Sequence, residues 1–279
     1  MLFRSIQTGQ LAATSVQVGL LLRPYPQFGQ VTSTSSDWAA SRYHALQLKL
    51  EKRYARGLAV LGSYTYSKLM DNSSGNLVGG EILSNGAVQD WNNLKAEWST
   101  SVLDQTHRFV ASVFYALPWG QRRQGALKWL LGGWETGAIL SVFTGAPLAI
   151  SESTGNDGSL GGSQRPNWTG VSAELPHPTS ALWFDVSQFS QPAQYTFGNT
   201  ARTLNGLRSD GVKSLDIGLS KTTQLTEKLR VLFRAEVFNL ANRPQFAPPN
   251  TQQGTLVFGM VSAMENLPRI VQFGLKFIY

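Results

Sequence analysis

Three histidines, His44, His107 and His177, are the first side chains here that suggest chemistry. His107 lies in the run Asp104–Arg108, together with a carboxylate and a threonine hydroxyl. These are the groups of a nucleophilic triad, in which an imidazole activates a hydroxyl and a carboxylate orients the imidazole. No nucleophile elbow accompanies the run, so a structural role is favoured. We therefore predict no catalytic residue and no enzyme activity.

Metal, cofactor and nucleic-acid sites are not indicated either. The sequence has no cysteine, and its three histidines are far apart. The glycine-rich tract 155–162 lacks the spacing of a calcium-binding EF-hand, and we interpret it as a loop. Lys and Arg (24) exceed Asp and Glu (17), which gives a net charge of +7, but the basic residues form no contiguous stripe. We predict no metal, no cofactor and no nucleic-acid partner.

The elements that must position these residues are strands, because apolar and polar residues alternate with period two. In Leu229–Leu240, for example, Val231 and Phe233 lie opposite Arg230 and Arg234. A membrane-crossing strand needs about 9–11 residues, whereas a strand in a soluble protein usually has about 5–6. The expected strands, most of them long, are 28–34, 46–51, 58–67, 107–117, 134–148, 215–220, 229–240 and 270–279.

The composition excludes several classes of protein. Only 15% of the residues are charged and 11% are aromatic, against roughly 25% charged in an average soluble domain. The many aromatic residues argue against disorder, and the lack of cysteine excludes a disulfide scaffold. No apolar run approaches the roughly 20 residues of a membrane helix. A membrane β-barrel fits these figures.

The connections between the expected strands alternate in length, as in outer-membrane barrels. Short connections lie near 56–57, 121–133 and 222–228, and long ones span 69–103, 151–211 and 242–267. We predict an all-β fold of about eight antiparallel transmembrane strands, with short periplasmic turns and long, mildly acidic extracellular loops. Residues 1–27 would be a lead-in and 28–279 the barrel portion. Whether the strands close, or form part of a larger barrel, stays open.

Particular segments resemble a known family. Arg269–Tyr279 is similar to the closing strand of an outer-membrane barrel, with alternating apolar residues and a terminal aromatic residue. Other segments resemble, in family order, the barrels of Oar-like TonB-dependent receptors, which carry a carboxypeptidase-regulatory-like domain. These segments are 22–28, 43–53, 63–68, 104–109, 183–185, 196–199 and 233–242. The resemblance covers residues from about 20 to 279.

The resemblance implies the barrel portion of a receptor that takes up a scarce, bulky ligand across the bacterial outer membrane. It also implies a barrel-assembly signal at Phe273, Leu275, Phe277 and Tyr279. The implied partners are outer-membrane lipid, the barrel-assembly machinery and a TonB complex. TonB would act only through a plug domain, and neither a plug nor a signal peptide is visible in this sequence. The alternatives are a small outer-membrane enzyme, a protease or lipase, and a soluble adhesin-like β-sandwich.

Overall fold

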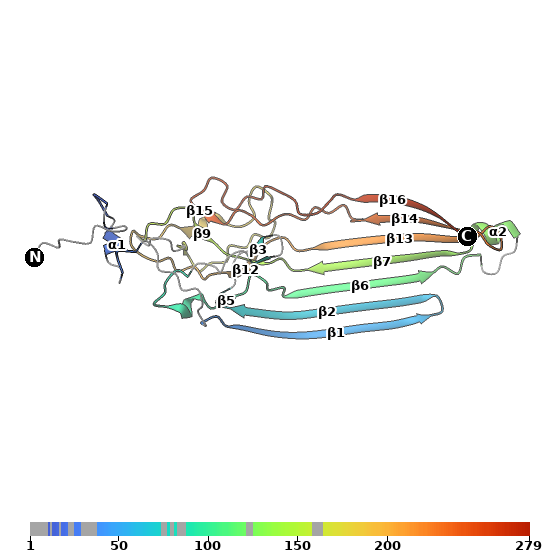
Figure 1. Ribbon diagram of the computed structural model, residues 1–279, viewed down its shortest axis with the longest axis horizontal. Coiled ribbons are helices and arrows are strands. Elements are labelled where there is room, and N and C mark those ends of the chain that lie inside the picture. The colour runs from blue at the N-terminus through green and yellow to red at the C-terminus, as the bar shows by residue number, and fades with distance from the viewer. Residues whose placement is uncertain are drawn as a thin grey trace, which may run out of the picture.

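The largest element of the protein is one antiparallel sheet whose long strands lie side by side (Figure 1). This computed structural model describes residues 11, 13–16, 18–21, 25–28, 38–73, 77–78, 81–82, 88–120, 125–157 and 164–279. Across the sheet the long strands are β1 (Ser41–Ala55), β2 (Leu58–Asp71), β6 (His107–Ala116), β7 (Trp134–Phe143), β13 (Lys213–Gln224), β14 (Arg230–Phe238) and β16 (Ile270–Ile278). Short strand β5 (Ser99–Thr100) pairs with β2 as the eighth. The predicted fold class is confirmed.

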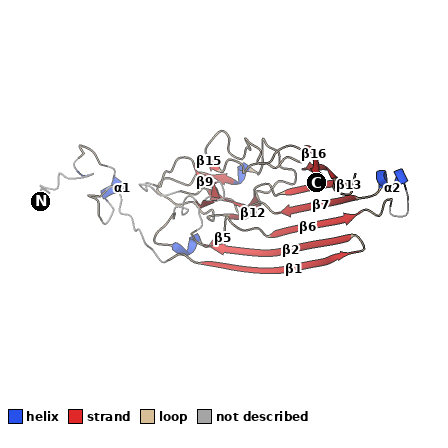
Figure 2. Cartoon of the chain, turned by 45° about the vertical axis from the view of Figure 1, so that its right-hand side comes forward, coloured by secondary structure: helices blue, strands red, loops and turns tan. Residues whose placement is uncertain are grey.

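The short connections all lie at one end of the sheet, and the long ones at the other (Figure 1). Arg56 and Gly57 have φ values of 53° and 83°, as the two central residues of a type I′ hairpin turn require. The β6–β7 connection differs from the expected simple turn, because it contains helix α2 (Gly125–Leu131), which extends beyond the strands in Figure 2.

One predicted strand is shorter in the structure than expected, and most of another lies outside the described residues. The strand expected over 134–148 ends at Phe143. The chain bends there, and a Cβ on Gly145 would lie 1.9 Å from the backbone oxygen of Ser209. Of the strand expected over 28–34, only Phe28 is described, and it lies in a bend. The remainder of that segment is outside the described residues.

The buried hydrophobic residues gather in the long connections and not in the sheet. We call described residues 88–106, 144–157, 164–212 and 239–269 the loop body. It contains η2 (Leu94–Glu97), β8 (Pro147–Leu148), β9 (Ser151–Glu152), β10 (Asn167–Trp168), η3 (Val186–Gln188), β11 (Phe189–Ser190), β12 (Leu204–Arg208) and β15 (Gln252–Gln253). Phe184, fully buried, packs against Phe189 and Phe258 with ring centroids 5.9 and 5.2 Å apart. The loops are therefore a packed structure.

The strand register divides the sheet into two chemically different faces. Residues directly opposite on paired strands share a face. Tyr64 pairs with Leu48 and Phe109, and Phe233 pairs with Lys221 and Leu275. Away from the strand ends, the apolar face comprises Leu46, Leu48, Leu50, Val60, Gly62, Tyr64, Phe109, Ala111, Val113, Thr136, Ala138, Leu140, Leu215, Ile217, Leu219, Val231, Phe233, Ala235, Val271, Phe273, Leu275 and Phe277.

This apolar face is open to the surroundings. Phe273 is 72% exposed and Phe277 56% exposed. The β-sandwich alternative requires these side chains to pack against a second sheet, so that alternative is wrong. Large apolar side chains left uncovered in a row mark a surface that meets lipid.

Charged side chains on the apolar face lie near the strand ends. On β13 they are Lys213 and Lys221. The eight residue steps between them correspond to about 27 Å along a strand, at roughly 3.4 Å per residue. Because barrel strands are tilted by about 35–45°, this length is about 19–22 Å of height, close to the apolar band of an outer-membrane barrel, which is about 25 Å tall. The two lysines therefore mark the two membrane boundaries.

Two edges of the sheet are open in the described part of the chain, because β1 and β16 each pair on one side only. In hydrocarbon, each unsatisfied backbone group costs several kcal/mol. Both edges therefore need partner strands inside a membrane. No helix among the described residues is long and apolar enough to cross a membrane.

The two faces make a prediction for neighbouring residues of β7. Leu140 lies on the apolar face and Ile139 on the opposite face. An arginine near the bilayer midplane costs about 2–4 kcal/mol on the lipid side of a barrel. Leu140 pairs with Leu215, between the midplane and the boundary at Lys213. Leu140→Arg should therefore weaken folding into phospholipid vesicles by about 1–3 kcal/mol, because the cost falls toward the interface, and Ile139→Arg by much less. Denaturant titration measures both, and equal losses would contradict the assignment of the faces.

Candidate functional site

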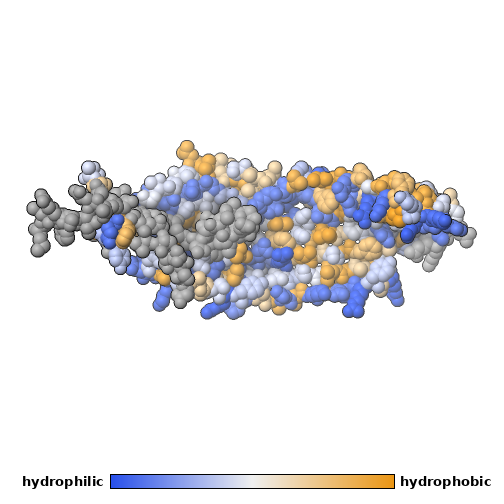
Figure 3. All heavy atoms as spheres, in the orientation of Figure 1, coloured by the Kyte–Doolittle hydropathy of each residue, from blue (hydrophilic) through white to orange (hydrophobic). Residues whose placement is uncertain are grey.

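The candidate site is the polar face of the sheet together with the loop body at one end of it. Polar positions on this face include Lys49, Glu51, Ser63, Thr65, Arg108, Ser112, Glu135, Ser141, Asp216, Ser220, Arg234, Glu236, Gln272 and Lys276. The Nζ atom of Lys49 lies 2.7 Å from Oε2 of Glu51. The Gln272 amide donates to Glu236 over 2.6 Å. In Figure 3 hydrophilic and hydrophobic residues are interspersed over the strands.

A hollow occupies the middle of this face. Its volume is about 670 Å³, and its lining extends from Lys49 and Glu51 on β1 to Glu236 on β14. Gly137 and Gly218 stand opposite each other on β7 and β13 and place no side chain in it. Leu61, Phe114 and Ile139 also line the hollow. The mixed charges and these apolar side chains suit an occupant with both polar and apolar parts.

Buried ion pairs hold the loop body together. The two terminal nitrogens of Arg165 donate to the two carboxylate oxygens of Glu97 over 2.8 and 3.0 Å. Both side chains are less than a tenth exposed. Arg202 bonds to the backbone oxygen of Glu97 over 3.0 Å and also pairs with Asp71 at the end of β2. Gln89 joins the cluster by accepting from the Arg165 N–H. This network fastens β2 to the loop body.

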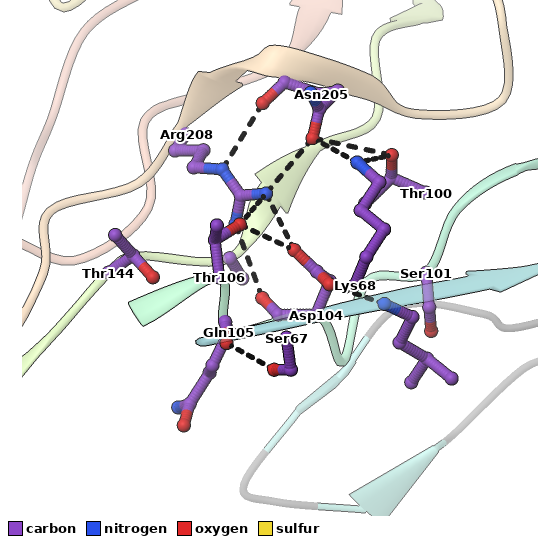
Figure 4. A network of polar contacts seen from close by, with 12 residues as sticks. Ser67, Lys68, Thr100, Ser101, Asp104, Gln105, Thr106, Thr144, Asn205 and Arg208 are labelled. Carbon is purple, nitrogen blue, oxygen red and sulfur yellow. Dashed lines mark hydrogen bonds and ion pairs between the residues drawn. The ribbon is translucent and has the colours of Figure 1, made fainter. Parts of the chain in front are cut away.

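A second network surrounds Asp104, whose side chain is fully buried (Figure 4). One carboxylate oxygen accepts from Arg208 over 2.7 Å and from the Thr106 hydroxyl over 3.0 Å. The other accepts from the backbone N–H of Leu69 over 2.6 Å. Lys68 reaches the same region and donates to Thr100 over 2.8 Å. The network thus joins β2, the start of β6 and β12.

A fourth pair joins Arg243 and Asp210, with Nη2 and Oδ1 2.7 Å apart. All four arginines of the long connections 69–103, 151–211 and 242–267 are therefore paired with a carboxylate. The paired residues are between 33 and 131 positions apart. Local sequence carries no signal for such pairs, and sequence analysis missed them.

Several family-like segments have structural roles in this body. Trp183 donates from its indole N–H to the Arg208 backbone oxygen over 2.8 Å. A Cβ on Gly198 would lie 1.9 Å from the Arg165 backbone oxygen, so only glycine fits this close approach. Asn239 and Asn242 have φ values of 50° and 49° where the chain leaves β14, a region that asparagine tolerates.

The triad considered for Asp104 and His107 is not assembled. The His107 ring bonds to the Tyr64 hydroxyl over 2.8 Å, and Tyr66 lies beside it with ring centroids 5.2 Å apart. Asp104 is occupied by Arg208, Thr106 and Leu69. His44 lies near the extracellular end of β1, opposite Lys68, and His177 lies in the loop body. The described contacts of Asp104 and His107 are structural.

No group that could hold a metal ion is found among the residues that the structure describes. Of the glycine-rich tract, residues 158–162 lie outside that part. The predicted assembly-signal residues, Phe273, Leu275, Phe277 and Tyr279, are all more than half exposed, and the first three lie on the apolar face of β16. Their role in assembly stays a prediction.

Glu152 on β9 differs from the carboxylates of Glu97, Asp71 and Asp104, which are paired with arginines. Its Oε1 atom is buried and has no hydrogen-bond partner among the described residues. Burial raises the pKa of this carboxyl to about 7. The charged form is therefore unfavourable in the folded loop body.

Breaking the Glu97–Arg165 pair should loosen the loop body. Removing one partner of a buried pair leaves an uncompensated charge, which costs about 3–5 kcal/mol. Glu97→Gln should therefore speed proteolysis of the loop body on whole cells. Glu51→Gln breaks an exposed pair worth about 0–1 kcal/mol and serves as control. Equal proteolysis rates for the two variants would contradict the role of the buried pair.

Glu152 should make stability depend on pH. The folded state holds the Glu152 proton more tightly than the unfolded state, so stability falls as the pH rises from about 4.5 through about 7. Glu152→Gln should remove this decline and raise the melting temperature at pH 8 more than at pH 4. Scanning calorimetry in detergent measures the change, with exposed Glu174→Gln as control. Parallel pH profiles for wild type and Glu152→Gln would refute the assignment.

The comparisons with known proteins agree with this architecture. The sequence matches the family described as outer membrane beta barrel domain over residues 3–272. Neither the curated proteins nor the solved structures contain a match. The match spans nearly the whole chain, and the sheet has the two faces that such a domain needs. The chain belongs to the outer membrane beta barrel domain family, and its location is the bacterial outer membrane.

Proposed function

We propose that the chain is the barrel portion of an Oar-like TonB-dependent receptor that takes up a scarce, bulky ligand. The observation that carries this proposal is the polar face of the sheet, with its hollow of about 670 Å³ between Glu51 and Glu236. A polar interior face beneath a packed loop body suits a conduit whose outer loops make first contact with a ligand.

The open edges support a large barrel in preference to a small one. In the described chain, β1 and β16 lack a partner on one side, and both need one in the membrane. The plug and the remaining strands would come from a region of polypeptide outside this chain. TonB would reach the barrel only through that plug.

The exposed apolar side chains of β16 support a role in assembly. Phe273, Leu275 and Phe277 stand in a row on the lipid side. We expect the barrel-assembly machinery to recognise them together with Tyr279. Outer-membrane lipid would then cover this face.

The enzyme alternative has weaker support. A protease or lipase needs a nucleophile and a base within hydrogen-bond reach of each other. The ring of His107 instead bonds to a tyrosine hydroxyl, and Asp104 is engaged by Arg208. The polar face suits the passage of a ligand better than it suits hydrolysis at the end of the strands.

Capture from native outer membranes tests the proposal. An antibody against the loop body should isolate a polypeptide whose peptides, read by mass spectrometry, include a plug domain. A captured polypeptide that has only a secretion signal ahead of these 279 residues would overturn the receptor proposal. Labelling of the captured polypeptide by a fluorophosphonate would favour the serine-hydrolase alternative.

A further inference from the structure

Helix α2 (Gly125–Leu131) presents apolar side chains that no described part of the protein covers. Leu127, Trp129 and Leu130 are 54–56% exposed, and the helix has no buried residue. Nearby Trp119 is 56% exposed. An isolated helix shorter than about 12 residues is marginal in water. The surroundings must therefore supply the contacts that stabilise α2.

The C-terminal end of α2 is fastened to the apolar face of the sheet. The ammonium group of Lys221 on β13 donates to the backbone oxygens of Trp129, Leu130 and Gly132 over 2.8, 2.9 and 2.7 Å. The Trp134 indole N–H donates to the Leu130 oxygen over 3.2 Å. Lys221 also lies over the Trp134 ring, 5.2 Å from its centroid.

Glycines enforce the sharp turn from α2 into β7. Gly133 has a φ of +77°, and a Cβ on it would lie 2.5 Å from the backbone oxygen of Thr222. A Cβ on Gly132 would lie 2.7 Å from the backbone oxygen of Lys128. The orientation of the helix against the strand ends is therefore set by backbone contacts.

The position of α2 identifies what covers it. Lys221 marks the membrane boundary at the short-turn end of the sheet, which is the periplasmic end in outer-membrane barrels. Trp134, which holds the helix, pairs with Lys221 on the apolar face. The exposed side chains of α2 thus continue the lipid-facing surface, and exposed Lys128 adds a cation at headgroup level.

We propose that α2, together with Trp119, is an interfacial anchor that inserts its apolar side chains into the phospholipids of the periplasmic leaflet. Leu127 and Leu130 share one side of α2 because they are three residues apart. Short helices with an apolar side, together with tryptophan and a basic residue, bind membranes in this way. The anchor would fix the height of β6 and β7 in the bilayer. This proposal rests on the outer-membrane location and not on transport.

The absence of cysteine from the sequence permits a clean test. Leu127→Cys and Leu130→Cys are each introduced into the full protein, labelled with a thiol-reactive NBD fluorophore and reconstituted in phosphatidylethanolamine–phosphatidylglycerol vesicles. Leu140→Cys, on the apolar face, is the lipid-exposed control. Leu256→Cys is the water-exposed control, because Leu256 is fully exposed in the loop body.

We expect doxyl-labelled phospholipid to quench the labels at positions 127 and 130 to within about twofold of the label at position 140, as insertion into the interface requires. Iodide in the water should quench them far less than the label at position 256. Iodide quenching equal to that at position 256 would overturn the proposal, because the helix would then lie in water. Protection from both quenchers would also overturn it, because protein would cover the helix.

Discussion

The structure depends on one constraint, which is that a backbone polar group in hydrocarbon must be hydrogen-bonded within the protein. Long paired strands meet this constraint, and the alternation of their side chains then separates an apolar face from a polar one. Leu48, Tyr64 and Phe109 fall on the same face only because the register of β1, β2 and β6 aligns them. The open edges at β1 and β16 leave the constraint unmet in the described chain, so both edges need pairing in the membrane.

Outside the membrane the same chain uses a different source of stability. The loop body packs Phe184 and Ile150 into a core of the kind found in soluble proteins. Four of its arginines are paired with carboxylates inside the protein, as Arg165 is with Glu97 and Arg208 with Asp104. Because Asp71 and Asp104 tie this body to β2 and the start of β6, the loops and the sheet form a connected structure.

Sequence reasoning predicted the long strands well and the loop body poorly, for physical reasons. Period-two alternation is local, so strands such as β14 and β16 appear directly in the sequence. The pairing of Glu97 with Arg165 joins residues 68 positions apart and leaves no local pattern. The sequence predicts only a short connection over 121–133 and not helix α2, although Gly132 and Gly133 mark a helix end. The candidate site was predicted only as a polar face, without its hollow.

An accessibility scan along β7 tests the central claim, which is that the two faces of the sheet meet lipid and water. Nitroxide labels would be placed at Ala138, Ile139, Leu140 and Ser141 in turn, and their collisions with oxygen and with a water-soluble nickel complex would be measured in bilayers. We predict that oxygen reaches positions 138 and 140 more readily, and that the nickel complex reaches 139 and 141. Equal accessibility at all four positions, or the opposite alternation, would contradict the account.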